Sequence, residues 1–147
     1  MQPNEKTLLG GKVHLQQLEP TQDDLGLFNG GDERGRVAMI GTKKTGIEYV
    51  EYAEFASPGV VRGRHYHRGL TESVYVVSGS IRMGFQRAEE LSSPTEWVTV
   101  KQGTLVTIAP LTTHLFKSLS PAVVICMGKG GDPFVDRIAD ASLDAVE

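Results

Sequence analysis

Hydrophobic and polar residues alternate with a period of two along most of the chain. In GIEYVEYAEFA, residues 46–56, Tyr49 and Phe55 share one face, whereas Glu48 and Glu54 share the other. Glycine, proline and serine separate further segments of this kind, which span residues 60–67, 72–77, 80–86, 96–100, 104–110, 114–119 and 122–128. Many short strands with frequent turns predict an all-β sandwich or barrel.

The two ends of the chain are less regular. LQQLEPTQDDL, residues 15–25, predicts either a short helix or a loop, and the tail after Asp132 predicts a short helix packed on the outside. No repeat, low-complexity tract or linker indicates a second domain. We therefore expect a single domain over residues 1–147, with a barrel core at about 28–130.

Composition narrows the class of protein. With 147 residues and 39% hydrophobic content, the chain can bury a core. The net charge is -3 and the basic residues are scattered, which argues against a nucleic-acid partner. No apolar run is long enough for a signal peptide or a membrane span, so we expect a cytoplasmic protein without a membrane partner. The single cysteine, Cys126, excludes an internal disulfide and is expected to be a small buried apolar residue.

The candidate chemistry lies in GVVRGRHYHRGLTESVYVVSG, residues 59–79. His65 and His67 project to the same face of a strand with Cα atoms about 6 to 7 Å apart, and Glu72 follows a short turn. His114, which follows a proline turn, offers a third imidazole. These side chains fit one divalent transition metal with open coordination positions, and the ligand types do not distinguish Fe, Mn, Ni, Zn and Cu. The alternatives are an acid–base pair of histidines and a polar stretch of an ordinary strand.

The spacing of these residues resembles the two sequence motifs of the cupin superfamily. The first motif is matched by Gly59, His65, His67, Glu72 and Gly79, and the second, with longer spacers, by Gly103, Pro110 and His114. Ser118 stands where the second motif has asparagine. The resemblance implies a double-stranded β-helix, also called a jelly-roll barrel, whose ligands point into its interior. It also implies a homodimer.

Three short segments, 32–35, 60–67 and 132–138, resemble a narrower group of cupins that act on nucleotide-linked sugars. These are the dTDP-4-keto-6-deoxyhexose 3,5-epimerases and, with greater similarity, the 3,4-ketoisomerases. The resemblance implies proton transfer next to a ketone, with His65 and His67 as base and acid. It also implies that Arg62 and Arg64 bind the substrate, with Arg62 near the nucleotide diphosphate.

Two features depart from these sugar enzymes. The ketoisomerases have glutamine where this chain has Glu72 and work without a metal, whereas a carboxylate beside two histidines favours metal capture or a raised histidine pKa. The epimerases follow the catalytic histidine with Tyr-Gln, whereas this chain has Tyr66 and His67. In addition, strict alternation places Arg62 and His65 on opposite faces, and only a bulge at Gly63 would bring both into one pocket.

Three classes of function therefore remain open. The first is an isomerase or epimerase of a nucleotide-linked keto-deoxysugar, which the Arg-Gly motifs favour. The second is a metal-dependent cupin dioxygenase or cyclase that acts on a biosynthetic intermediate, which Glu72 favours. The third is a domain that binds a small molecule without converting it, and no residue pattern specifically favours it.

Overall fold

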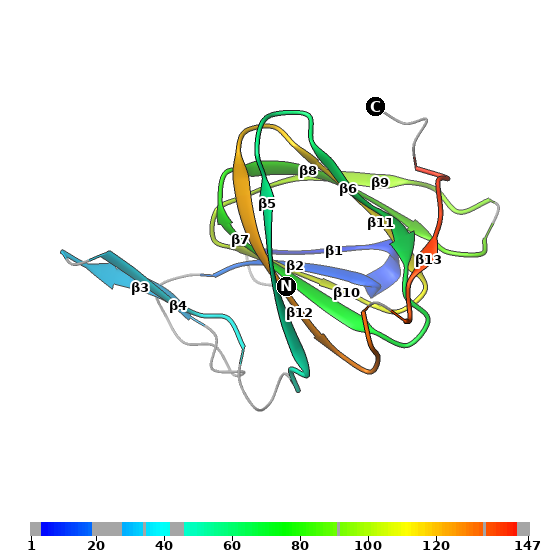
Figure 1. Cartoon of the computed structure of the whole chain (residues 1–147), viewed down its shortest axis with the longest axis horizontal. Coiled ribbons are helices and arrows are strands. Elements are labelled where there is room, and N and C mark those ends of the chain that lie inside the picture. The colour runs from blue at the N-terminus through cyan, green and yellow to red at the C-terminus, as the bar shows by residue number, and fades with distance from the viewer. Residues whose placement is uncertain are drawn as a thin grey trace.

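A computed structural model of the protein describes residues 4–18, 28–33, 35–41, 46–90, 92–133 and 135–143. Strands dominate, and most of them lie in two antiparallel sheets that face each other as a barrel (Figure 1). The first sheet has the order β1 (Glu5–Leu8), β2 (Val13–Gln17), β10 (Thr104–Ile108), β7 (Thr71–Ser78), β12 (Ala122–Lys129) and β5 (Tyr49–Phe55). The second has the order β13 (Ile138–Ala139), β6 (Val61–Tyr66), β11 (Thr112–Ser118), β8 (Ser80–Arg87) and β9 (Glu96–Lys101).

From β5 to β13 the chain alternates between the two sheets, except at the β8–β9 hairpin: β5, β7, β10 and β12 lie in the first sheet, whereas β6, β8, β9, β11 and β13 lie in the second. This alternation is the connectivity of a jelly roll. Each segment with a period-two pattern forms a strand. The predicted all-β jelly-roll fold is confirmed.

The N-terminal boundary predicted for the barrel core is wrong. β1 and β2, joined by a 3-10 turn at Leu9–Gly11, extend the first sheet, and the apolar side chains of Leu8, Val13 and Leu15 are buried in the core. Part of the segment predicted as a short helix or loop is therefore strand β2, and residues 19–27 lie outside the described residues.

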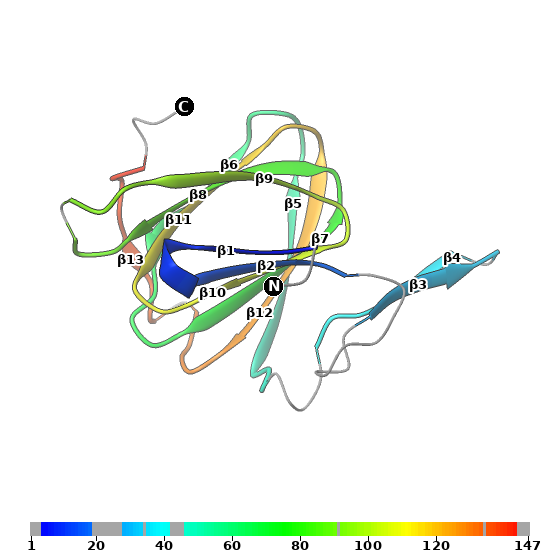
Figure 2. The ribbon, with the colours of Figure 1, turned by 180° about the vertical axis from the view of Figure 1, so that it is seen from behind.

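Residues 28–39 do not start the barrel. β3 (Phe28–Asp32) and β4 (Gly35–Met39) pair only with each other, as a two-stranded sheet. This sheet projects away from the barrel in both views of the ribbon (Figures 1 and 2).

The short helix predicted for the C-terminal tail is absent from the tail residues that the structure describes, 132–133 and 135–143. Instead, β13 pairs with β6, with Ile138 opposite Tyr66 and Ala139 opposite His65. Without β13, β6 would be an edge strand. The pairing provides hydrogen-bond partners for main-chain N–H and C=O groups of β6, which a helix in the tail would leave unpaired. Leu143 is fully buried beyond it. Residues 144–147 lie outside the described part.

The hydrophobic core lies between the two sheets. Val74 and Val76 from β7 are fully buried, as are Ile81, Met83 and Phe85 from β8. Burial of each such side chain contributes about 1.5–3 kcal/mol to folding. Few polar side chains are buried in this interior. Those of them that can ionise, His67, Glu72 and His114, belong to the candidate site. Among the described residues, no helix is long and apolar enough to cross a membrane.

Candidate functional site

Three histidines and one glutamate converge inside the barrel. His65 lies on β6, His67 directly follows it, His114 lies on β11, and Glu72 comes from β7 in the facing sheet. One possible ligand atom from each residue lies within 4.8 Å of all the others, and every side chain except that of His65 is buried. The structure thus brings together the four side chains that the sequence predicted as metal ligands.

The main chain orients all three imidazoles in the same way. Each Nδ1 faces a carbonyl oxygen, which can only accept, so each Nδ1 carries a proton and donates it. These bonds run from His65 to Gly63 (3.1 Å), from His67 to Asp136 (2.6 Å), and from His114 to Thr112 (3.1 Å). The Nε2 atoms are therefore the ones that point at one another and at Glu72.

This orientation creates a set of facing acceptors. The Nε2 atoms of His65 and His114 are 3.2 Å apart, and Nε2 of His67 lies 3.1 Å from a carboxylate oxygen of Glu72. When Nδ1 holds the proton of a neutral imidazole, Nε2 presents a lone pair. Facing lone pairs repel unless a cation lies among them, either a proton or a metal ion. The donor set of three imidazole nitrogens and one carboxylate fits a divalent transition metal.

Burial and neighbouring charges shift the pKa values of the four side chains in different directions. Burial, together with repulsion from the protonated form of His114, lowers the pKa of His65 to about 4, and burial likewise lowers the pKa of His114. Burial opposes ionisation of Glu72, but the nearby histidines outweigh it and lower the pKa of this carboxyl. Burial also opposes charge on His67, yet its hydrogen bonds to Glu72 and to the Asp136 carbonyl raise its pKa. His65 and His114 are therefore neutral at pH 7, and Glu72 is ionised.

Residues of the cluster line two hollows that have several lining residues in common. A small cavity of about 50 Å³ is lined by His65, His67 and Glu72 together with Tyr49, Glu51, Cys126, Pro133 and Arg137. A larger cavity of about 240 Å³ shares His65 and Glu72 with it and is also lined by His114 and Arg62. Its volume is below the 300–1,000 Å³ that is typical of pockets for a whole drug-sized ligand.

A bulge in β6 shapes this larger cavity. His114 pairs with His65, but the next residue of β11, Leu115, pairs with Gly63, so Arg64 is the extra residue. Gly63 has φ +97°, and a Cβ atom there would lie 2.7 Å from the carbonyl oxygen of His114. Glycine is therefore required at this position by both backbone conformation and space.

The bulge decides which arginine reaches the site. It brings Arg62 and His65 to the same cavity, whereas strict alternation along the strand would place them on opposite faces. The Nε–H of Arg62 donates to the carbonyl oxygen of Glu54 at 2.9 Å, and its guanidinium lies 5.5 Å from the centre of the Phe55 ring. Arg64 is exposed and lines neither cavity. The substrate-binding role of Arg64 therefore stays a prediction that neither cavity supports.

Tertiary structure adds residues to the site that we did not predict as functional. Tyr49 lines the small cavity, and burial, with the charge of Glu72, raises the pKa of its hydroxyl far above the usual range, so the hydroxyl stays protonated. Cys126 is buried as expected, and burial raises the pKa of its thiol. Asp136 and Arg137 come from the tail, where the only sequence signal was the resemblance of residues 132–138 to sugar-acting cupins. The other segment of that resemblance, 32–35, lies in the β3–β4 sheet, and Arg34 is outside the described residues.

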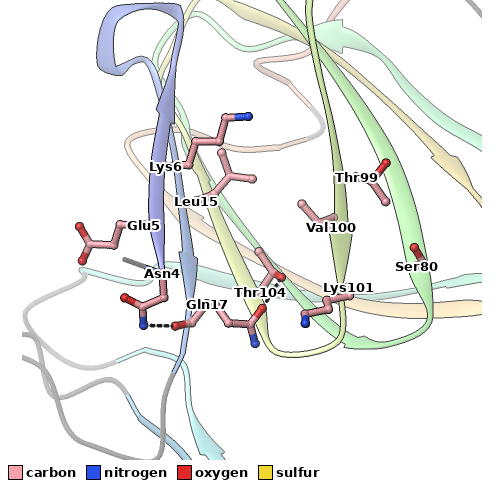
Figure 3. Close-up of a pocket in the computed structure, with 10 residues that line it drawn as sticks. All are labelled: Asn4, Glu5, Lys6, Leu15, Gln17, Ser80, Thr99, Val100, Lys101 and Thr104. Carbon is pink, nitrogen blue, oxygen red and sulfur yellow. Dashed lines mark hydrogen bonds between the residues drawn. The ribbon is translucent and has the colours of Figure 1, made fainter. Parts of the chain in front are cut away.

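A more voluminous hollow of about 600 Å³ lies between the edge strands β1 and β9 (Figure 3). The side chains of Lys6 and Lys101 extend toward the space between the two strands, and the buried side chains of Leu15 and Val100 also line the hollow. Its one carboxylate, Glu5, lies 3.6 Å from His14. The described lining holds no convergent histidines or acids, so we place the chemistry at the smaller cavities despite their size.

Comparison with protein families identifies the group to which the chain belongs. The family model described as polysaccharide biosynthesis C-terminal domain matches residues 30–141. The chain belongs to this family. No curated protein matches it. The family assignment covers part of β3 and all of β4 to β13, and it therefore includes every residue of the histidine cluster.

Solved structures similar to this family member share its jelly-roll fold. A mutant of the 3,4-ketoisomerase QdtA from Thermoanaerobacterium thermosaccharolyticum, in complex with TDP-4-keto-6-deoxyglucose, has 16% identity, a TM-score of 0.69 and 90% coverage of both chains. The 3'-monoepimerase ChmJ from Streptomyces bikiniensis, in complex with dTDP-quinovose, has 18% identity and a TM-score of 0.72 over 95% of this chain and 74% of that chain. The epimerase RmlC from Legionella pneumophila, in complex with dTDP-4-keto-L-rhamnose, has 21% identity and a TM-score of 0.70 over 97% and 79% of the two chains. At these identities the likeness establishes the cupin-type fold.

Proposed function

We propose that this protein isomerises or epimerises a nucleotide-linked keto-deoxysugar by moving a proton next to the carbonyl group. The observation that carries this proposal is the position of His65, a neutral imidazole that lines both cavities, with Arg62 in the same larger cavity. Membership of a polysaccharide biosynthesis family supports a sugar substrate. The ligands of the similar ketoisomerase and epimerase structures, which are nucleotide-linked sugars, support the same class.

The proposed reaction uses His65 as the base and a second group as the acid. Nε2 of His65 accepts the proton from the carbon next to the carbonyl, and the electron pair of that C–H bond forms a C=C bond. The carbonyl oxygen takes a proton in the same step, which gives an enediol. His67, whose charged form Glu72 stabilises, and the protonated Tyr49 are the candidate donors. Return of a proton to the former carbonyl carbon, with loss of the hydroxyl proton from the first carbon, gives the isomer. Return of a proton to the other face of the first carbon, with loss of the proton from the former carbonyl oxygen, gives the epimer.

We further propose, as an alternative state of the cluster, that His65, His67, Glu72 and His114 hold one divalent transition metal. In that state the Nε2 atoms are ligands, so His65 does not act as the base. The facing lone pairs of the cluster support this proposal, since a cation removes their repulsion. Such an ion would supply a Lewis acid for a substrate oxygen. The main-chain carbonyls that accept from the Nδ1 atoms would fix the ligand orientation.

The sugar reaction is tested by hydrogen exchange. The protein is incubated with TDP-4-keto-6-deoxyglucose in heavy water, and the sugar ring is followed by NMR. We expect deuterium to enter the ring without oxygen consumption, and we expect His65→Asn to abolish this exchange. His14→Asn is the matched control, because His14 is paired with Glu5 on β1, outside both cavities. A ring that stays free of deuterium with the wild-type protein excludes the proposed reaction on this substrate.

A second candidate function is a metal-dependent dioxygenase or cyclase that acts on a biosynthetic intermediate. The convergence of four ligand atoms within 4.8 Å favours it, because the sugar reaction by itself needs only an acid and a base. Purified protein should then carry close to one equivalent of a transition metal, which elemental analysis measures. Glu72→Gln and His67→Ala should lose the metal, whereas Glu54→Gln and His14→Ala should keep it. Full metal content in the first two variants would rule out this ligand set.

The expected homodimer is retained as a proposal that rests on the resemblance to cupins. Light scattering coupled to size-exclusion chromatography measures the mass of the assembly directly. A mass of 16.0 kDa, that of one chain, would contradict the dimer.

A further inference from the structure

The C-terminal segment 135–140 crosses the cluster and is fastened there by one aspartate. Both carboxylate oxygens of Asp136 accept main-chain N–H groups of the turn that follows His67: those of Arg68 (2.9 Å), Gly69 (2.7 Å) and Leu70 (2.9 Å). The carbonyl oxygen of Asp136 accepts the Nδ1–H of His67 at 2.6 Å. A single residue therefore ties the tail both to the histidine and to the turn that leads to Glu72.

The residues around the Asp136 carboxylate are tightly packed. A Cβ atom on Gly131 would lie 3.0 Å from a carboxylate oxygen of Asp136, and a Cβ atom on Gly69 would lie 2.9 Å from the carbonyl oxygen of Gly130. Beyond the aspartate, Ile138 and Ala139 pair with β6, and the main-chain N–H of Asp140 donates to the Arg64 carbonyl at 2.8 Å. The segment is thus held on both sides of Arg137.

This attachment places Arg137 at the candidate site. Asp136 engages the 68–70 turn, whereas the side chain of the next residue, Arg137, lines both cavities together with His65. Arg62 lines the larger of the same two cavities. Two guanidinium groups from distant parts of the chain therefore share one cavity, alongside the exposed carboxylate of Glu51. Guanidinium groups are the side chains that best match the oxygens of a phosphate.

We infer that Arg137 binds the diphosphate of the substrate together with Arg62, and that Asp136 is the positioning residue that holds Arg137 there. This inference rests on the proposed function, because it takes the ligand to be nucleotide-linked. It adds a specificity-determining residue from the tail to a site whose other members come from the barrel strands.

Titration calorimetry with TDP tests the arginine. Loss of a charged hydrogen-bonding group should weaken TDP binding by about tenfold or more in Arg137→Ala, and Arg137→Lys should be intermediate because it keeps the charge but not the planar donor pair. Arg82→Ala is the matched control, since Arg82 packs on Trp97 outside both cavities. Binding of thymidine, which has no phosphate, should not differ between Arg137→Ala and the wild type. The KM for the nucleotide sugar should rise more than kcat falls.

A double-variant comparison tests the aspartate. Asp136→Ala should weaken TDP binding, and adding Arg137→Ala to it should cost little more, because the aspartate acts through the arginine. Hydrogen exchange at the main-chain amides of residues 68–70 should become faster in Asp136→Ala and not in Arg137→Ala. If Asp136→Ala fails to fold, Asp136→Asn, which keeps one acceptor oxygen, is used in the same comparison.

The outcomes separate this inference from the proposed reaction. TDP binding by Arg137→Ala with wild-type affinity overturns the inference, even when deuterium exchange into the sugar supports the reaction. Weakened binding in Arg137→Ala supports the inference, even when no deuterium enters the sugar. Fully additive losses in the double variant overturn the positioning role of Asp136. Absence of TDP binding by the wild-type protein overturns the inference as a whole.

Discussion

Replacement of Gly63 by alanine should damage both the stability and the candidate site. Gly63 has φ +97°, where a side chain is strained by about 1–3 kcal/mol. The added Cβ atom would also lie 2.7 Å from the carbonyl oxygen of His114, a main-chain atom that cannot swing away as a side chain can. Such overpacking costs about 1–3 kcal/mol. The two contributions sum to a loss of about 2–6 kcal/mol in the free energy of unfolding.

Gly11 provides a control that separates these contributions. Its φ of +96° is almost the same as that of Gly63, but no atom lies within 4 Å of an added Cβ. Gly11→Ala should therefore show the backbone strain alone, and the difference between the two variants measures the contact with His114. Urea unfolding of both variants and the wild type, all stripped of metal, gives the free energies at equal slope.

The site provides a second measurement for the same variant. Movement of the His114 main chain should disturb its pairing with His65, so Gly63→Ala should lose metal binding and deuterium exchange, whereas Gly11→Ala should keep both. Equal destabilisation by the two alanines would refute the contact with His114. A Gly63→Ala protein with wild-type stability would refute the account of the bulge as a whole.

Three further predictions follow from individual side chains. In metal-stripped protein, the pKa of His65 is lowered from 6.5 to about 4, so the unfolded chain binds more protons between these values and stability should fall as pH falls from 6.5 to 4. Partial exposure reduces this loss to about 2–3 kcal/mol, and urea titrations of His65→Gln should show a flatter pH profile than those of the wild type. Ser118→Ala removes a hydroxyl that accepts from the Val60 N–H at 3.0 Å and donates to the Ser57 carbonyl at 2.7 Å; it should cost about 1–3 kcal/mol in chemical denaturation, and an unchanged midpoint would contradict this role. Tyr49→Phe should leave the fold intact but slow deuterium exchange by about 10²–10⁴-fold, and an unchanged rate would remove Tyr49 from the acid role.

The strands of the barrel could be predicted because their signal is local. Alternation of apolar and polar side chains is visible within a single segment, and it located every strand from β5 to β12. The same alternation is present in β2, where Val13 and Leu15 are buried, but it is too short to be distinguished from a loop. β13 has only two residues and forms because β6 offers an open edge, which no local pattern shows.

The residues of the candidate site likewise fall into those that local sequence spacing predicted and those that depend on distant contacts. His65 and His67 lie on one strand segment and Glu72 follows a tight turn, so their spacing alone predicts that they meet. His114 could be added through the second cupin motif. The two arginines could not be assigned, because the choice between Arg62 and Arg64 depends on the bulge opposite His114.

By itself, the sequence determined the all-β class, the central strands and the histidine–glutamate cluster, since period-two alternation and short spacings act over a few residues. Only the tertiary structure decided that Arg62 and Arg137 line the site while Arg64 does not, and that the Asp136 main chain orients His67. The physical reason is the range of the interactions. A bulge and a docked tail depend on hydrogen bonds between residues that are about 50 to 70 positions apart, and their partners are fixed by the pairing of whole sheets.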